Sequence, residues 1–168
     1  MPPSLSPAAV LMPIVERPEG LSLLLTRRAS ALRRHAGQIS FPGGRLEAAD
    51  AGPLGAALRE TEEEIGLMRD FVTVAGYLRP HVIITGYWVV PVVGFVKPGF
   101  ALRLDAAEVE EAFEVPLAYV LDRANHVRRE RQIGPLAIKT TEIPYGDHVI
   151  WGATAAMLLA LSRLLNEA

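Results

Sequence analysis

Three glutamates within five residues have the type and spacing of ligands for a metal ion. If residues 53–65 form a helix, a rotation of about 100° per residue places Glu60, Glu63 and Glu64 on one face. Carboxylates at these spacings lie roughly 5–6 Å apart and repel one another by about 1 kcal/mol per close pair in bulk water. A divalent cation removes this repulsion, and Mg²⁺ or Mn²⁺ prefers such oxygen ligands. The alternative is a glutamate-rich helix that faces solvent and binds no metal.

A run of arginines directly precedes these acids. Residues 20–46 contain five arginines and no acidic residue, whereas residues 47–64 contain six acids and a single base, Arg59. The planar guanidinium group suits phosphate, so a basic segment beside a metal-binding helix indicates a site for a phosphorylated ligand. The competing interpretation is that both runs are solvated surfaces that pair with each other.

Two apolar runs before the arginines predict a β-hairpin. Residues 8–15 and 21–26 flank residues 17–20, where proline and glycine indicate a turn. Residues 28–45 are expected to form a loop that contains a short strand near Ile39.

The acidic segment predicts a helix over residues 53–65. Proline stands in its first turn and Gly66 follows its last residue, as is common at helix ends. The stripe expected to be buried consists of Leu54, Leu58, Thr61 and Ile65.

The second half of the chain predicts further strands and short helices. Valine-rich runs predict strands over residues 72–78 and 83–96. The other expected elements are helices over residues 106–113, 117–121 and 152–165 and a hairpin over residues 126–143 that turns at Gly134-Pro135. Together these elements predict an α/β (α+β) fold, a mixed sheet with a few helices on its faces, in one domain over residues 1–168.

The order of residues 44–67 resembles the signature of the Nudix hydrolase superfamily, G-x5-E-x7-R-E-U-x-E-E-x-G-U. The R-E-x-x-E-E-x-G core is intact at residues 59–66. Three positions depart from the signature: Asp50 replaces the first glutamate, one extra residue separates it from Arg59, and Thr61 replaces an aliphatic residue. None of these changes removes a glutamate of the predicted metal site.

Residues 24–44 resemble a second motif, L-L-T-x-R-[SA]-x3-R-x3-G-x3-F-P-G-G, of the coenzyme A pyrophosphatase branch of that superfamily. Every specified position is matched, and the two motifs meet in register at Gly43-Gly44. Shorter matches to this branch surround Tyr87 and Trp151. The resemblance implies the Nudix-like α/β/α sandwich.

The same resemblance implies hydrolysis of a nucleoside diphosphate derivative with Mg²⁺ or Mn²⁺ as cofactor. The expected substrate is coenzyme A or one of its thioesters, which water would split into 4′-phosphopantetheine and adenosine 3′,5′-bisphosphate. Glu60 and Glu64 are the expected metal ligands, with Glu63 as the third. The resemblance implies that Arg59 orients a neighbouring glutamate rather than binding substrate.

Four positions of the upstream motif are candidates for substrate binding. Arg28 and Arg33 would contact the substrate or its diphosphate, and Gly43 and Gly44 permit a close backbone approach that a Cβ atom would obstruct.

The general base must be a carboxylate within reach of the attacking water. Glu63 is one candidate. The others belong to a later acidic segment and are Glu108, Glu110, Glu111 and Glu114.

Composition excludes several other classes of protein. A net charge of −2, from 17 basic and 19 acidic residues, excludes a strongly basic nucleic-acid binder and a highly charged disordered chain. The chain has no cysteine, which excludes disulfides and thiolate catalysis. The first 16 residues lack the pattern of a secretory signal, and the apolar run at residues 149–162 is too short to span a bilayer. We therefore expect a cytoplasmic protein without nucleic-acid or membrane partners, and a homodimer is compatible with this.

Two alternatives to a coenzyme A diphosphatase stand beside it. The first is a Nudix enzyme for ADP-ribose or a dinucleotide. The second is a non-catalytic nucleotide sensor, although a sensor has no need of the complete R-E-x-x-E-E pattern. An RNA-binding or decapping role lacks a platform of basic and aromatic residues.

Overall fold

The first hairpin forms the centre of the fold. The computed structural model describes residues 4–32 and 37–168, in which β1 (Ser6–Arg17) and β2 (Gly20–Arg28) pair antiparallel, with Arg17 opposite Gly20. The predicted hairpin is thereby confirmed. Most of β1 is buried, because its alternate side chains pack into hydrophobic clusters on both faces of the sheet.

The strands form a large mixed sheet. Its central order is β3-β2-β1-β7-β5; β4 also pairs with β1, β6 with β7, and β8 with β2. Strand β7 runs parallel to β1, and the other pairs in this sheet are antiparallel. The remaining bounds are β3 Ile39–Ser40, β4 Gly43–Arg45, β5 Val72–Tyr77, β6 His81–Ile83, β7 Tyr87–Val96 and β8 Val109–Pro116.

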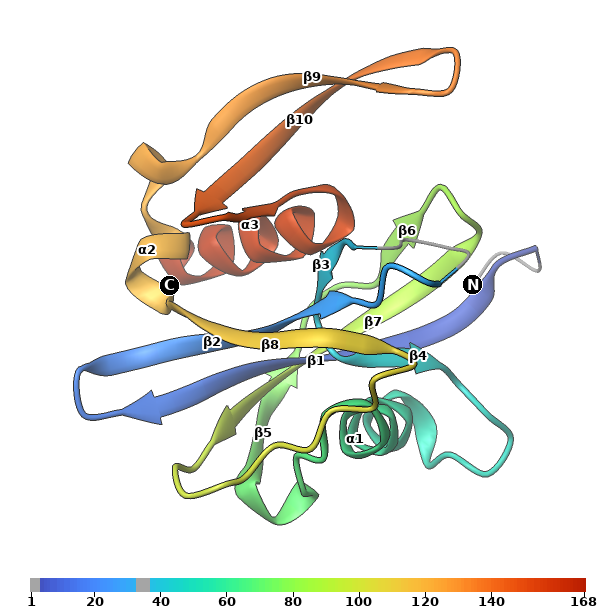
Figure 1. Cartoon of the computed structure of the whole chain (residues 1–168), viewed down its shortest axis with the longest axis vertical. Helices are drawn as coiled ribbons and strands as arrows, with labels where there is room; N and C mark the ends of the chain where they lie inside the picture. The colour runs from blue at the N-terminus through green and yellow to red at the C-terminus, as the bar shows by residue number, and fades with distance from the viewer. Residues whose placement is uncertain (1–3, 33–36) are drawn as a thin grey trace.

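Helices cover both faces of this sheet, which confirms the predicted α/β sandwich. Figure 1 shows α1 (Gly52–Ile65) on one side and α3 (Gly152–Glu167) on the other. One hydrophobic cluster contains Ala56, Ala57 and Ile65 of α1, and the other contains Leu158 and Leu161 of α3. The short elements are α2 (Leu117–Leu121) and 3₁₀ turns at Arg69–Phe71 and Arg123–Asn125. No helix in the described ranges is long and apolar enough to cross a membrane.

The buried side of α1 accommodates a polar residue. Thr61 is 1% exposed, and its hydroxyl donates a hydrogen bond of 2.7 Å to the Ala57 carbonyl oxygen. This bond satisfies the hydroxyl where an aliphatic side chain is usual. Leu54 and Leu58, predicted to belong to the buried stripe, are only partly buried.

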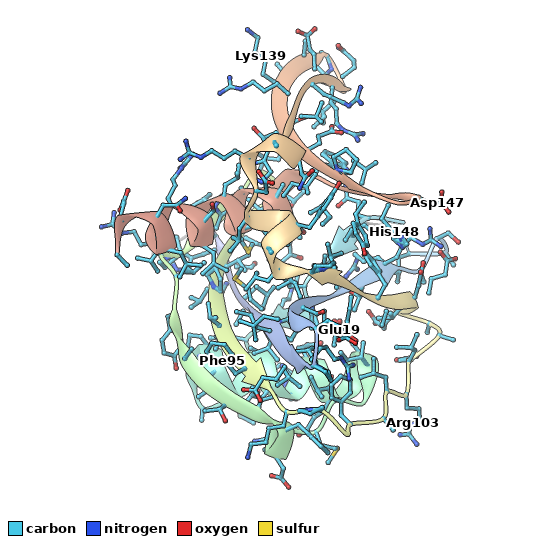
Figure 2. The ribbon with its side chains drawn as sticks, turned by 90° about the vertical axis from the view of Figure 1, so that its left-hand side faces the viewer. Glu19, Phe95, Arg103, Lys139, Asp147 and His148 are labelled. Atoms are coloured by element: carbon cyan, nitrogen blue, oxygen red, sulfur yellow. The ribbon has the colours of Figure 1, made fainter. Side chains whose placement is uncertain are left out.

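A second antiparallel ribbon extends from the body of the molecule (Figure 1). It consists of β9 (Val127–Ile133) and β10 (Leu136–Tyr145), with β11 (His148–Ile150) paired to the end of β10. The predicted hairpin and its turn at Gly134-Pro135 are confirmed. Figure 2 shows Lys139 on this ribbon, at the opposite end of the molecule from Arg103.

The helix predicted over residues 106–113 is wrong, because residues 109–116 form strand β8. Val109, Phe113 and Val115 pack into the hydrophobic clusters, and the backbone pairs antiparallel with β2. Pairing along β2 outweighs the helical preference of the glutamates and alanines in this segment. The strand predicted over residues 83–96 is also divided, since β6 ends at Ile83 and β7 begins at Tyr87.

The end of α1 is joined to the segment that precedes β8. Gly66 ends the helix with a φ of 70°. The last carbonyl groups of a helix lack partners within it, and here the Glu64 oxygen accepts from the Asp105 amide at 2.9 Å and the Ile65 oxygen from the Arg103 amide at 2.8 Å. The same contacts that end the helix therefore fix residues 103–105 beside its last turn.

Gly66→Ala is expected to lower the free energy of unfolding by about 3 kcal/mol. A Cβ atom at this position would lie 2.9 Å from the Arg103 backbone nitrogen, in addition to the cost of the positive φ. Gly146→Ala is the matched control, because its φ is 57° and a Cβ there meets no atom within 4 Å. We expect a loss of about 1 kcal/mol for that variant in urea unfolding. Equal losses in the two variants would contradict close packing at Gly66.

Candidate active site

Helix α1 brings two carboxylates of the predicted metal site together. Glu64 is 7% exposed, and Glu60 is partly buried one turn earlier. Burial raises the pKa of Glu64 to about 8, and the negative charge of Glu60 contributes to this shift. Burial also raises the pKa of Glu60 above its ordinary value. The site thus holds two acids in surroundings that disfavour their charged forms.

The two glycines where the motifs meet lie directly against these carboxylates. A Cβ atom on Gly44 would lie 2.5 Å from the carboxyl carbon of Glu60, and one on Gly43 would lie 2.3 Å from the Ala9 carbonyl oxygen. A backbone hydrogen bond from Gly43 also favours the charged form of Glu64. Strand β4 approaches the helix this closely because Gly44 lacks a side chain, and the absence of one at Gly43 allows the close contact with β1.

Arg59 connects α1 to the loop before it. Its Nε and Nη2 donate to the two carboxylate oxygens of Asp50 at 2.8 and 3.0 Å. Its Nη1 contacts Glu60 Oε1 at 3.1 Å and Glu63 Oε2 at 3.3 Å. Hydrogen bonding to Arg59 lowers the pKa of Asp50 to about 2. The guanidinium group of Arg59 therefore bridges the Asp50 carboxylate and the two glutamates, Glu60 and Glu63.

The third predicted ligand, Glu63, lies further out than the other two. Its side chain is 59% exposed, and its negative charge is close enough to raise the pKa of Glu60. Glu62, which the helical geometry directs elsewhere, pairs with Arg69 at 3.1 Å.

Of the four later glutamates considered as the general base, Glu108 is the one whose charge acts on the predicted metal ligands, although its side chain is exposed. Its charge raises the pKa values of both Glu60 and Glu64. Its backbone is held by a hydrogen bond of 2.9 Å from the Ala29 amide to its carbonyl oxygen.

The other three glutamates of that segment have arginine partners elsewhere. Glu110 and Glu111 each lie 3.2 Å from Arg27, and Glu114 forms a two-pronged pair with Arg17. Proximity to the Glu60–Glu64 pair thus separates Glu108 from its neighbours in the sequence.

The arginines predicted to bind substrate have different surroundings. Arg28 lies close enough to Glu64 for its charge to oppose the rise in that pKa, and its Nε is buried without a hydrogen-bond partner among residues that the structure describes. Arg33 lies outside the described residues. Arg27 forms ion pairs with Glu110 and Glu111.

The Glu60–Glu64 pair fits a divalent cation. Two acids with raised pKa values, one of them nearly buried, supply oxygen ligands whose charge Arg59 and Arg28 compensate only in part. Within residues 4–32 and 37–168, no group of three or more acidic or histidine side chains is gathered closely enough to hold a metal by itself. Mg²⁺ is usually held by one or two carboxylates together with substrate phosphates, which is the arrangement that this pair can provide.

Two parts of the site have little signal in the sequence. Asp50 departs from the family pattern, yet its carboxylate is the bidentate partner of Arg59. The turn that orients Glu108 depends on Asp105, whose carbonyl accepts the Glu108 amide at 3.0 Å and whose side chain accepts the Ala107 amide at 3.1 Å. An Asp three residues before Glu108 is a weak turn signal that could have indicated this loop.

The fold and this site together define a Nudix protein. The model of the NUDIX domain matches residues 5–136, and the chain belongs to this family. It is 41% identical over 155 residues to the uncharacterized Nudix hydrolase NudL of Escherichia coli K12. The aligned region covers 92% of this chain and 80% of that protein. The NudL protein of Photorhabdus laumondii is 40% identical over 156 residues, or 93% and 83% of the two chains. Enzymes of this family generally use divalent metal ions.

Solved structures agree on the fold. A Nudix hydrolase from Mycobacterium smegmatis, RenU, matches 96% of this chain and 86% of its own with a TM-score of 0.67 and 19% identity. The Nudix domain of Shewanella oneidensis NrtR, solved with ADP ribose, matches 98% and 89% with a TM-score of 0.59 and 16% identity. At these identities the likeness concerns the fold alone.

Glu64→Gln is expected to raise the melting temperature of the metal-free protein in a pH-dependent way. The pKa of Glu64 is about 8 in the fold and about 4.3 in an unfolded chain, so folding takes up a proton between these values. The free energy of unfolding of the wild type therefore decreases, through this group, as pH rises from about 4.5 to about 8. Thermal melts should show almost no gain from the variant near pH 4.5 and a gain of about 5 °C near pH 8.

Glu62→Gln, on the same helix but paired with Arg69 at the surface, is the control and should show no such trend. Added Mg²⁺ should raise the melting temperature of the wild type at pH 8 more than that of Glu64→Gln. A gain that is the same at every pH would contradict a buried, uncompensated carboxylate at position 64.

Proposed function

We propose that this protein hydrolyses nucleoside diphosphate derivatives in a metal-dependent reaction, and that its substrate is coenzyme A or a coenzyme A thioester. The observation that carries the reaction type is the pair of a nearly buried Glu64 and a partly buried Glu60, which lies against Gly43-Gly44 and close to the cation of Arg28. The choice of coenzyme A is supported by residues 24–44, in which every specified position of the coenzyme A pyrophosphatase motif is matched.

In this proposal Glu60 and Glu64 hold the cation, and Glu63 is the third ligand. A divalent ion bound there would neutralise oxygens of the diphosphate and acidify a water molecule. Arg59 acts as a positioning residue, because its guanidinium group holds Glu60 and Glu63 while Asp50 holds the guanidinium group. Arg28 and Arg33 are the proposed substrate contacts, with the Gly43-Gly44 backbone allowing close approach.

Two carboxylates are proposed candidates for the general base. Both side chains are exposed. Glu63 lies next to Arg59 on α1, and Glu108 lies in the segment before β8, near enough for its charge to raise the pKa values of Glu60 and Glu64. The effect of its charge on both carboxylates favours Glu108, because a general base must lie within reach of a water molecule bound at that pair.

ADP-ribose is the second candidate substrate. The NrtR Nudix domain, whose fold this chain shares, was solved with ADP ribose. The upstream motif favours coenzyme A over it, so the two substrates form the decisive comparison.

Purified protein with Mg²⁺ or Mn²⁺ is expected to hydrolyse coenzyme A to 4′-phosphopantetheine and adenosine 3′,5′-bisphosphate. Glu60→Gln should lower kcat on the order of 10²–10³-fold or more, because it removes a ligand of the cation that neutralises the reacting diphosphate. Product identification by mass spectrometry in ¹⁸O-labelled water also locates the phosphorus that is attacked.

The Glu62→Gln variant controls for loss of charge on α1 and should keep its rate. Turnover of ADP-ribose with coenzyme A inert would refute the substrate assignment. Unchanged rates in both Glu60→Gln and Glu64→Gln would refute the metal site.

Glu108→Gln is expected to lower kcat about 10²–10⁴-fold, the usual contribution of a general base. The loss should be accompanied by disappearance of the acidic limb from the pH–rate profile, while metal-induced stabilisation in thermal melts is retained. Glu110→Gln, two residues away and paired with Arg27, should stay within about twofold of the wild type. If Glu63→Gln abolishes the acidic limb and Glu108→Gln leaves it in place, Glu63 is the base.

A further inference from the structure

We propose that Arg45, oriented by Tyr87, binds a phosphate monoester on the nucleoside part of the substrate. For coenzyme A this group is the ribose 3′-phosphate. The class of ligand follows from the proposed function, on which this inference rests. The inference gives a specificity-determining role to Arg45, a position at which neither sequence motif specifies a residue.

Arg45 is rigidly connected to the catalytic helix. It follows Gly44 in β4, and these two residues pair with Ala8 and Ala9 of β1. Arg59, which holds the glutamates, also donates its Nη2 to the Arg45 carbonyl oxygen at 3.1 Å. Arg45 therefore keeps a fixed position about 3.3 Å along the strand from the glycine that touches Glu60.

The side chain of Arg45 lies on the other face of the sheet from Glu60. The missing Cβ of Gly44 points at the Glu60 carboxylate, and successive residues of a strand alternate between faces. The contact with Tyr87 agrees, since that ring packs against the hydrophobic cluster on the α3 side. Among the described strands, β4 pairs only with β1, so its other edge is open. A ligand that crosses this open edge can contact both faces of the sheet.

The cation of Arg45 has a neutral partner. Its Nε and Nη2 donate to the Tyr87 hydroxyl oxygen at 3.3 and 3.0 Å, and its guanidinium carbon lies 5.4 Å from the ring centroid. A phenol is uncharged at neutral pH. Within the described part of the chain, no carboxylate lies within ion-pair distance of Arg45, whereas Arg27 has two such partners and Arg59 has four.

These features match the needs of a phosphate monoester. Such a group carries about −1.5 to −2 charges at pH 7, and a guanidinium group held in one plane can donate to it through two N–H groups. Tyr87 sets that plane, which makes it a positioning residue. The substrate diphosphate would then lie at Glu60 and Glu64 on one side of β4, with its nucleoside phosphate at Arg45 on the other.

Direct binding tests the inference independently of turnover. The full-length protein in EDTA, which prevents phosphate binding through a metal, is titrated by calorimetry with adenosine 3′,5′-bisphosphate and with adenosine 5′-phosphate. We expect the wild type to bind the bisphosphate at least about tenfold more tightly. Arg45→Gln should abolish this preference, Arg45→Lys should keep part of it, and Tyr87→Phe should reduce it about threefold.

Arg128→Gln, at an exposed arginine of the β9–β10 ribbon, is the matched control and should retain the full preference. A wild type without preference, or an Arg45→Gln variant that weakens both nucleotides equally, would overturn the inference; the second result would indicate stacking on adenine instead. A failure of the proposed function would give a different result. The wild type would then not hydrolyse the diphosphate, yet it would still bind the bisphosphate more tightly than adenosine 5′-phosphate.

Discussion

The site depends on keeping the carboxylate of Glu64 nearly buried beside that of Glu60. Burial and the neighbouring charge raise the pKa of Glu64 to about 8, so the fold is under electrostatic strain whenever this group is ionised. The apolar face of α1 compensates, because Ala56, Ala57 and Ile65 are fully buried against the sheet and fix the helix in place. A cation between the two acids would turn this unfavourable arrangement into a favourable one and would couple metal binding to stability.

The contacts that end α1 also complete the site. The carbonyl groups of Glu64 and Ile65 accept backbone hydrogen bonds from residues 103 and 105. The chain then turns at Asp105 and enters β8, with Glu108 at the entrance and its carbonyl bonded to Ala29 at the end of β2. The position of Glu108 is thus set by backbone hydrogen bonds on both sides, from the helix and from the sheet.

The sequence predicts most of the fold, and it predicts the helix of the site in detail. Hydrophobic runs and turn residues indicate the first hairpin, α1, α2, the ribbon and α3, because each of these depends on local pattern. Residues 106–113 are predicted wrongly because their strand depends on pairing with β2, more than 80 residues earlier along the chain. The same non-local pairing sets Glu111 beside Arg27, and the exposed Glu108 just before β8 lies near enough to α1 for its charge to act on Glu64. Four similar glutamates in one segment give no sign of this difference in the sequence. The contact of Arg45 with Tyr87, 42 positions apart, is likewise set by the parallel alignment of β1 and β7.

A comparison of two buried glutamates shows what distinguishes the site from the rest of the molecule. Glu142, 1% exposed at the base of the ribbon, has Arg131, Arg129 and the Thr140 hydroxyl as partners, and hydrogen bonding to Arg131 lowers its pKa. Glu64 is 7% exposed, and its pKa is raised because the nearby charge of Arg28 does not offset burial and the charge of Glu60. The arginines of the ribbon therefore stabilise the charged form of Glu142. On α1, the charged form of Glu64 lacks comparable stabilisation. A cost that the fold avoids at Glu142 is thus retained at Glu64, where a cation bound as proposed would relieve it.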